Sequence, residues 1–262
     1  PRISDINVHV FTDAGPYAWP QYLYSNQELA DNILNAAYGQ ILEQQAPARG
    51  VWMEAVQRLN RTMETVTRIV EVGPPVKIRW ANATWNTHDF NVAVEGSTTI
   101  SDNKLTINAA GSDIWGLKDG FRYAYQNVKG DFTATVILHS APTTDGWSKA
   151  GIMARAAATS TSPHITVMGT NSNGLHVQYR PKELEESLDI GGGSWKNGVP
   201  VYLRLIRKGK QFTGQSSSDG KAWSTLGTVT IDLPDEVLLG PASTAHNAYL
   251  PGDAVFSDWK LS

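Results

Sequence analysis

The sequence contains no cysteine. This absence excludes disulfide bonds, thiolate metal sites and cysteine nucleophiles, so the hydrophobic core alone has to stabilise the fold. No apolar run approaches the ~20 residues that cross a bilayer, and the first residues lack the basic and apolar regions of a signal peptide. An initiator methionine is readily removed before proline, and the chain begins with Pro1. We therefore expect an unexported chain that does not span a membrane, with a place at the edge of a membrane complex left open.

Charged residues are also few. They make up 18% of the chain, and the formal net charge is -3. Proteins that bind nucleic acid normally carry a basic patch or stripe, so the composition argues against a nucleic-acid partner. Hydrophobic residues make up 41% of the chain, which is typical of a folded, globular protein.

Motifs that hold a cofactor or a metal ion are missing. The six histidines show no metal-ligand spacing, and no serine nucleophile motif stands beside them. The run Gly191 to Gly193 lacks the continuation of a phosphate-binding loop, and no calcium loop is present. We predict no cofactor and no metal ion.

One acidic cluster is the candidate for hydrolytic chemistry. It comprises Glu183, Glu185, Glu186 and Asp189. Retaining glycosidases need two carboxylates about 5 Å apart. The cluster stands between Pro181 and a glycine run, so we interpret it as a mobile loop without the alternating carboxylates of such enzymes. We predict that the protein is not an enzyme, and a glycoside hydrolase using Glu183 and Glu186 is our third hypothesis.

Residues 1–25 are rich in aromatic residues and interrupted by glycine and proline, which predicts an extended segment rather than a helix. Its candidate docking residues are Tyr17, Trp19, Tyr22 and Tyr24. Such a segment either packs on the protein's own domain or docks on a partner or a membrane interface, where tyrosine and tryptophan are favoured.

Residues 26–75 are expected to form a helical hairpin. Ser25 and Glu28 have the spacing of a capping box, and apolar residues at three- and four-residue spacing predict a helix over 26–45. A second apolar stripe, which includes Trp52, predicts another helix that ends before Gly73. A hairpin has little core of its own. Its stripes therefore cover the protein's own sandwich or anchor the protein in an assembly.

From residue 76 onwards the helical period gives way to short alternating segments bounded by turn residues, which predicts an all-β domain over 76–262. The predicted strands are Phe90–Glu95, Lys104–Ala109, Phe121–Gln126, Phe132–Ser140, Ala150–Ala156, His164–Thr170, Leu175–Arg180, Val201–Lys208, Gln211–Ser216, Thr225–Ile231, Val237–Ser243 and Ala254–Leu261. Asn173-Gly174 and Asp219-Gly220 predict tight hairpin turns between antiparallel neighbours.

Several motifs in this region resemble the concanavalin A-like lectin/glucanase superfold, and more closely the DUF1349-type, regulation-of-enolase-like domains. The motifs run in order through about residues 85–262: GSDIWG (111–116), FRYAYQ (121–126), GDFT (130–133), DGWSKAGIMAR (145–155), the segment 174–180, YLRLIR (202–207), SSDGKAW (217–223) and TAHN (244–247). The resemblance implies an antiparallel, jelly-roll type β-sandwich preceded by the helical hairpin. Such domains often accompany secreted carbohydrate-active proteins but also stand alone, so the resemblance implies a fold more strongly than a function.

A possible ligand face follows from strand alternation. Alternate residues of a strand share a side, so His176, Gln178 and Arg180 point one way. If the neighbouring strands are adjacent, Arg155 and Arg204 join them, and rim loops add Trp115, Trp147 and Lys149. Planar hydrogen-bonding groups beside aromatic rings suit a sugar, but any solvated sheet face has a similar composition, and the arginines also suit a partner's carboxylates.

Our leading hypothesis from the sequence is a non-enzymatic interaction subunit, in which residues 1–75 attach the lectin-like sandwich to a larger assembly such as a membrane complex or a virion-like particle. The alternative is a carbohydrate-binding module that holds a glycan on the polar face. These two hypotheses differ in whether the hairpin packs on its own sandwich or on a partner.

Overall fold

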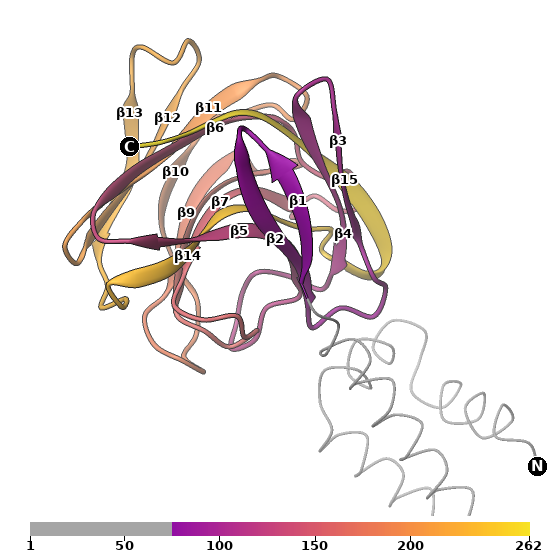
Figure 1. The fold of residues 1–262 in the computed structure, drawn as a ribbon, viewed down its shortest axis with the longest axis horizontal. Helices are drawn as coiled ribbons and strands as arrows, with labels where there is room; N and C mark the ends of the chain where they lie inside the picture. The colour runs from indigo at the N-terminus through magenta and orange to yellow at the C-terminus, as the bar shows by residue number, and fades with distance from the viewer. Residues whose placement is uncertain (1–74) are drawn as a thin grey trace, which may run out of the picture. The chain divides into compact units, whose positions relative to one another are not determined.

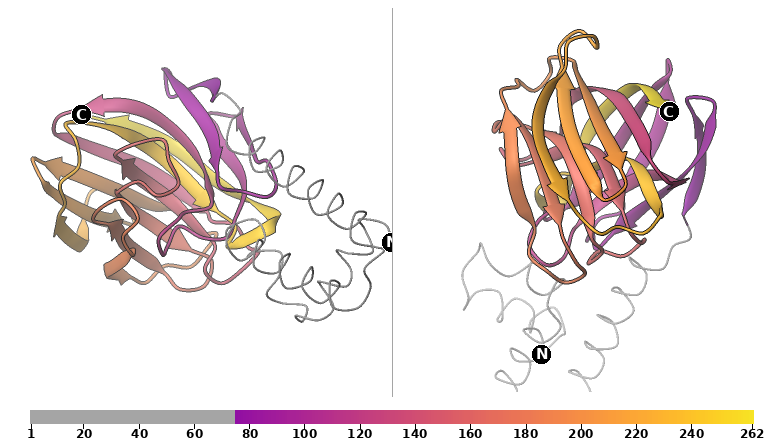
Figure 2. Two further views of the ribbon diagram at one scale, coloured as in Figure 1. Left: turned by 90° about the horizontal axis from the view of Figure 1, so that it is seen from below. Right: turned by 90° about the vertical axis from the view of Figure 1, so that its left-hand side faces the viewer.

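The computed structural model describes residues 75–262. These residues form two antiparallel sheets that pack face to face (Figure 1; Figure 2). The first sheet has eight strands, in the order β1 (Val76–Trp80), β2 (Ala83–Phe90), β5 (Phe121–Lys129), β14 (Glu236–Thr244), β7 (Lys149–Arg155), β8 (His164–Thr170), β9 (Leu175–Arg180) and β10 (Leu188–Gly193). The second has seven, in the order β13 (Ser224–Thr230), β12 (Gln211–Ser217), β11 (Val201–Lys208), β6 (Phe132–Ser140), β15 (Asn247–Leu261), β4 (Lys104–Gly111) and β3 (Ser97–Ser101).

The predicted β-sandwich is thus confirmed for residues 75–262. The extended segment 1–25, the helical hairpin 26–75 and their docking residues Tyr17, Trp19, Tyr22, Tyr24 and Trp52 lie outside the described residues, apart from Pro75, and stay predictions. No helix in the described part of the chain is long and apolar enough to span a membrane.

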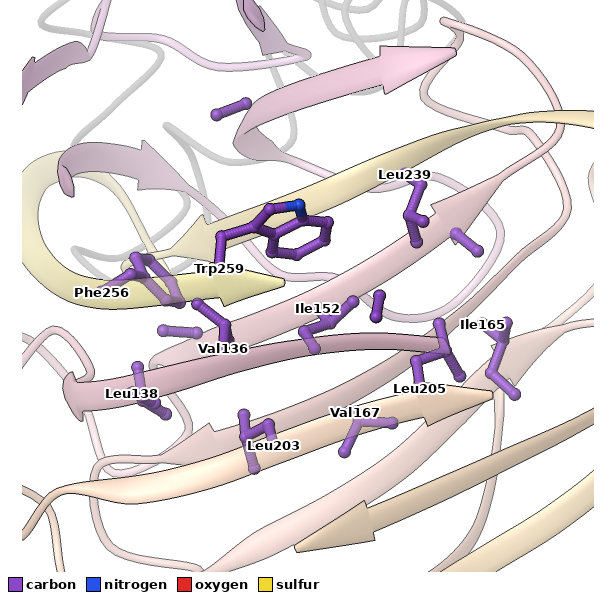
Figure 3. Packing of buried hydrophobic residues seen from close by; sticks show 14 of the residues in the cluster. Val136, Leu138, Ile152, Ile165, Val167, Leu203, Leu205, Leu239, Phe256 and Trp259 are labelled. Carbon is purple, nitrogen blue, oxygen red and sulfur yellow. The ribbon is translucent and has the colours of Figure 1, made fainter. Parts of the chain in front are cut away.

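Alternating residues of β6 and β11 build the core between the sheets. Val136 and Leu138 on β6, and Leu203 and Leu205 on β11, are fully buried and point towards apolar residues of β7 and β8 in the other sheet (Figure 3). Burial of one such side chain contributes about 1.5 to 3 kcal/mol. The alternation therefore fixes which face of each strand meets the other sheet.

The outer face of the eight-stranded sheet carries a second apolar cluster. Its members are Phe90, Ile114, Phe121, Tyr123, Tyr125, Met153, Met168 and Ala242. Ile114 belongs to the connection between β4 and β5, so this connection covers part of the outer face. All seven residues of β7 and all seven of β8 are consequently buried.

Both predicted hairpin turns are confirmed. Gly174 and Gly220 have positive φ angles of 81° and 70°, which glycine adopts without strain. They stand between the antiparallel neighbours β8 and β9 and between β12 and β13, respectively.

The structure corrects the prediction of a mobile loop from Pro181 to Gly193, because Leu188–Gly193 is the edge strand β10, paired with β9. Glycine is a poor strand former, and the run of three glycines hid the strand. A Cβ on Gly192 would overlap the carbonyl oxygen of Leu175, so the close pairing requires glycine there.

A second correction concerns the segment Phe90–Glu95, which was predicted to be a strand. β2 ends at Phe90, and Asn91 has a φ of 48°, a left-handed conformation that ends the extended backbone. β1, β2 and β3 were not predicted. Apolar and polar residues do alternate in β1, but over only five residues, and β2 and β3 contain few apolar residues.

Candidate functional site

The outer face of β7, β8 and β9 carries most of the polar side chains that the sequence predicts there. β7 and β9 both pair with β8, which aligns Arg155 with His164 and His164 with Arg180. Alternate residues of β9 share a side, so His176 and Gln178 lie on the same face as Arg180.

The structure does not bring Arg204 to this face. Arg204 lies on β11 in the seven-stranded sheet, where its guanidinium carbon is 3.5 Å from the centroid of the Trp223 ring. Strand alternation predicts the side of a strand on which a residue lies, but it does not predict the sheet to which the strand belongs.

Arg155 and Arg180 are fully buried around one carboxylate. Asp119, which is also fully buried, accepts hydrogen bonds at Oδ2 from Nη1 of Arg155 at 2.7 Å and at Oδ1 from Nη2 of Arg180 at 2.5 Å. Nη1 of Arg180 donates to Oδ2 as well, at 2.6 Å. The guanidinium groups therefore pair inside the protein and do not face solvent.

The buried groups of this cluster shift one another's pKa values. Burial by itself raises the pKa of Asp119, but Arg155, His164 and Arg180 together hold that pKa below its usual range. Burial, reinforced by both arginines, lowers the pKa of His164 to about 3, against the opposing effect of Asp119. His164 is therefore neutral at neutral pH.

Arg180 also joins segments that are distant in the sequence. Its Nη2 donates to the carbonyl oxygen of Gly116 at 2.9 Å, and its Nε donates to that of Glu185 at 3.0 Å. Its Nη1 donates to the carbonyl oxygen of Ser162 at 3.2 Å. One buried guanidinium thus fixes the segment that carries Trp115.

Two Asp-x-Trp segments flank this part of the sheet. Asp113 accepts a hydrogen bond from the backbone N–H of Ile114, and Asp145 accepts one from the backbone N–H of Trp147, both at 2.7 Å. Each aspartate thereby fixes the backbone that presents a tryptophan, and Trp115 and Trp147 remain 38% and 41% exposed.

His246 lies between the two aspartates. Its Nε2 is 3.4 Å from Oδ2 of Asp113, and its Nδ1 is 3.1 Å from Oδ1 of Asp145. His246 stands in the turn between β14 and β15, so a third segment of the chain joins the two that carry the tryptophans.

Lys149 supports Trp115 from inside the domain. Its Nζ lies 2.7 Å from Oδ1 of Asp113, donates to the carbonyl oxygen of Ile114 at 3.1 Å, and is 5.4 Å from the centroid of the Trp115 ring. The side chain of Lys149 is only 2% exposed, so its charge acts from beneath the exposed indole.

Polar groups also surround Trp147. Its ring centroid is 5.3 Å from that of His176, and Nδ1 of His176 lies 2.6 Å from Oδ2 of Asp189 on β10. Nε2 of Gln178 donates to the same oxygen at 3.1 Å, and its Oε1 is buried with no hydrogen-bond partner within residues 75–262. Nε2 of His176 lies 3.0 Å from the carbonyl oxygen of Asn173, so both of its ring nitrogens have partners. Asp189 remains partly exposed and presents its carboxylate to solvent.

We call this surface the tryptophan rim. It comprises Asp113, Trp115, Asp145, Trp147, Lys149, His176, Asp189 and His246. The sequence predicted Trp115, Trp147, Lys149 and His176 as site residues, and Trp115, Trp147 and His176 are partly exposed in the rim. Lys149 does not come from a rim loop as predicted: it is the first residue of β7, and its side chain is buried beneath the rest of the rim. Asp113, Asp145, Asp189 and His246 were not predicted as binding residues, although the repeated Asp-x-Trp pattern was a detectable signal for the first two.

Of the acidic cluster that was considered for hydrolysis, Asp189 belongs to the rim, whereas Glu183 and Glu186 do not. Glu183 accepts a hydrogen bond from the hydroxyl of Thr161 at 3.0 Å, and both Glu183 and Glu186 are exposed. Within residues 75–262, no group of three or more histidine, aspartate or glutamate side chains is arranged to hold a metal ion.

No family model matches the sequence, and no curated protein matches it either. A solved structure does resemble it: a functionally unknown protein from Saccharomyces cerevisiae, with 19% sequence identity and a TM-score of 0.51 over 63% of this chain and 91% of that chain. This likeness shows a shared fold, the sandwich of two antiparallel sheets, which is consistent with the predicted concanavalin A-like superfold. The finer assignment to DUF1349-type domains stays a prediction.

Two further solved structures are similar at lower scores. The GH43 BlXynB protein from Bacillus licheniformis is 14% identical with a TM-score of 0.49, over 63% of this chain and 34% of that chain, so the match spans about a third of its length. The carbohydrate binding module CBM66 from Bacillus subtilis is 13% identical with a TM-score of 0.48, over 68% of this chain and 94% of that chain.

Proposed function

We propose that residues 75–262 are a non-catalytic carbohydrate-binding domain and that the glycan binds at the tryptophan rim. The observation that carries this proposal is the pair of exposed indoles, each fixed by an aspartate two residues earlier and surrounded by polar side chains. A sugar ring has an apolar C–H face and a hydroxylated edge. An exposed indole beside hydrogen-bonding groups matches both.

Each side of the rim has a separate role. Trp147 offers its ring to the sugar, with His176 packed against the indole, and the partly exposed Asp189 accepts hydrogen bonds from sugar hydroxyl groups beside it. Trp115 offers a second ring over Lys149. Since two exposed rings suit two sugar units, we expect an oligosaccharide rather than a single sugar as the ligand.

The rim is also held in place before a ligand arrives. Asp113, Asp145 and Lys149 fix the backbone on either side of the indoles, and Arg180 fixes the segment 112–120 from below. Ordering flexible groups on binding costs about 0.5 to 1.5 kcal/mol for each side chain. A fixed platform avoids much of that cost and favours binding.

The rim carboxylates support a non-catalytic role. Asp113 accepts hydrogen bonds from Ile114 and Lys149, and Asp145 accepts one from Trp147, so each has a structural role in its loop. Asp189, the third rim carboxylate, pairs with His176 and accepts a hydrogen bond from Gln178. A retaining glycosidase instead needs one carboxylate free as nucleophile and a second as general acid.

A panel of soluble oligosaccharides, screened by calorimetry against the full-length protein, tests the proposal. We expect saturable binding of at least one glycan class with no release of reducing ends on long incubation. Hydrolysis of the bound glycan would contradict the non-catalytic role, and no binding across neutral, acidic and amino sugars would contradict the glycan site.

Attachment to a larger assembly is a second proposal, and it rests on the amphipathic stripes of residues 26–75 in the sequence. Light scattering on a gentle extract would compare the full-length chain with a chain that begins at Val76. A large complex for the first and a monomer for the second would support attachment, and two monomers would contradict it.

A further inference from the structure

Both ring nitrogens of His246 face carboxylate oxygens, Nε2 at 3.4 Å from Asp113 and Nδ1 at 3.1 Å from Asp145. A carboxylate only accepts hydrogen bonds. A neutral imidazole carries one N–H and can donate to one of the two aspartates, whereas the imidazolium carries two and can donate to both.

The two aspartates belong to the two Asp-x-Trp segments. Asp113 fixes the backbone at Ile114, next to Trp115, and Asp145 fixes the backbone of Trp147. Protonation of His246 therefore links the two segments through one side chain, and loss of the proton removes one of the two links.

We propose that His246 is a proton-controlled clamp of the tryptophan rim: when it is protonated, it holds both Asp-x-Trp segments in the arrangement that binds the ligand. This inference rests on the glycan site proposed above. It predicts tighter binding below the pKa of His246 than above it.

The backbone holds His246 in position independently of its charge. His246 has a φ of 50°, and Ser148 donates a hydrogen bond from its hydroxyl to the carbonyl oxygen of Ala245 at 2.6 Å. The turn is thus joined to the segment that carries Trp147, so a change of charge acts on the side-chain links rather than on the turn.

The charged groups that face His246 come from three elements. Asp113 on the 112–120 segment raises the pKa of His246 through its hydrogen bond, burial opposes this, and Asp145 raises the pKa further. Lys149 on β7 lowers it. Together these effects raise the pKa of His246 above its usual value, because two carboxylates and only one ammonium group face its ring.

The test measures the affinity of the full-length protein for a glycan that binds it, at about pH 5 to about pH 9, for the wild type and for His246→Asn. Asparagine tolerates the left-handed backbone at this position but cannot become cationic. We expect the wild type to lose about five-fold or more in affinity as the pH rises through the pKa of His246, and the variant to bind weakly at every pH.

His139→Gln is the matched control, because His139 lies on β6 in the other sheet. It should keep the wild-type pH dependence. A wild-type affinity that does not change with pH, or a His246→Asn variant that keeps the dependence, would overturn the clamp and leave the glycan site standing.

A readout without ligand separates failure of the clamp from failure of the glycan site. In NMR titrations of the full-length protein, the indole N–H signals of Trp115 and Trp147 should shift with the same midpoint as the His246 ring. Asp145→Asn should lower that midpoint, because a carboxylate that stabilises the imidazolium is lost. Indole signals that do not shift as His246 titrates would contradict the clamp, whether or not a glycan binds.

Discussion

Nη2 of Arg180 lies 2.5 Å from Oδ1 of Asp119, and both side chains are completely buried. Asp119 also pairs with buried Arg155, so two guanidinium groups share one carboxylate. Removal of one partner from a buried ion pair leaves uncompensated charge in a medium that solvates it poorly. These ion pairs lie beneath the segment that carries Trp115. We therefore expect the position of Trp115 in the tryptophan rim to depend on them.

Asp119→Asn should therefore destabilise the domain by about 3 to 5 kcal/mol, measured as the free energy of unfolding in urea. The amide has almost the same shape, so the loss reports the charge. Asp235→Asn is the control, because Asp235 pairs with Lys129 at the surface and should change stability by less than about 1 kcal/mol. Equal effects of the two substitutions would contradict the role of the buried cluster.

The depressed pKa of His164 predicts how stability depends on pH. The folded-state pKa is about 3, whereas an unfolded chain has a value near 6.5. Between these values the unfolded chain binds more protons, so His164 lowers stability as the pH falls, by up to about 1.4 kcal/mol for each pH unit.

Urea unfolding of the wild type and of His164→Gln across this range measures the effect. The variant should lose less stability between about pH 6 and about pH 4 than the wild type loses, because it lacks this proton uptake on unfolding. Parallel pH profiles for the two proteins would show that His164 is not held neutral in the folded state.

The pairing of β10 with β9 predicts a strong effect at Gly192. Gly192→Ala should disrupt the pairing of β10 with β9, because the added Cβ overlaps the carbonyl oxygen of Leu175. We expect a loss of about 1 to 3 kcal/mol and faster amide hydrogen exchange in β9 and β10. Gly146→Ala is the control, since a Cβ there meets only ordinary contacts at 3.6 Å. Unchanged exchange in Gly192→Ala would contradict the strand.

The sequence predicted the sandwich because its core strands alternate so regularly. β6 and β11 show this pattern clearly, and apolar residues such as Val136 and Leu203 face the other sheet as expected. β10 escaped prediction because its glycines carry no side chains to form a pattern. A strand is recognisable from the sequence only where apolar and polar side chains alternate along it.

The candidate site was partly predictable for the same reason. Alternation places His176 and Gln178 on one face, but it does not show that the segments beside Asp119 cover Arg155 and Arg180. It also gives no information on which sheet receives Arg204. Burial by a distant segment and assignment to a sheet both depend on contacts between residues far apart in the sequence.

The convergence of the two Asp-x-Trp segments on His246 depends on such contacts as well. Asp113, Asp145 and His246 are separated by many residues, and each motif alone predicts only a local turn. Their proximity follows from the packing of the rim loops at one end of the eight-stranded sheet.

The most direct measurement of the central claim is the affinity of the full-length protein for a glycan from the panel, determined by calorimetry for the wild type, Trp115→Ala, Trp147→Ala and Trp223→Ala. Trp223 is partly exposed, lies in the turn between β12 and β13 of the other sheet, and serves as the matched control. The account predicts a loss of about ten-fold or more in affinity for each rim variant and wild-type affinity for the control. Wild-type affinity in both rim variants, or an equal loss in Trp223→Ala, would contradict a glycan site at the tryptophan rim.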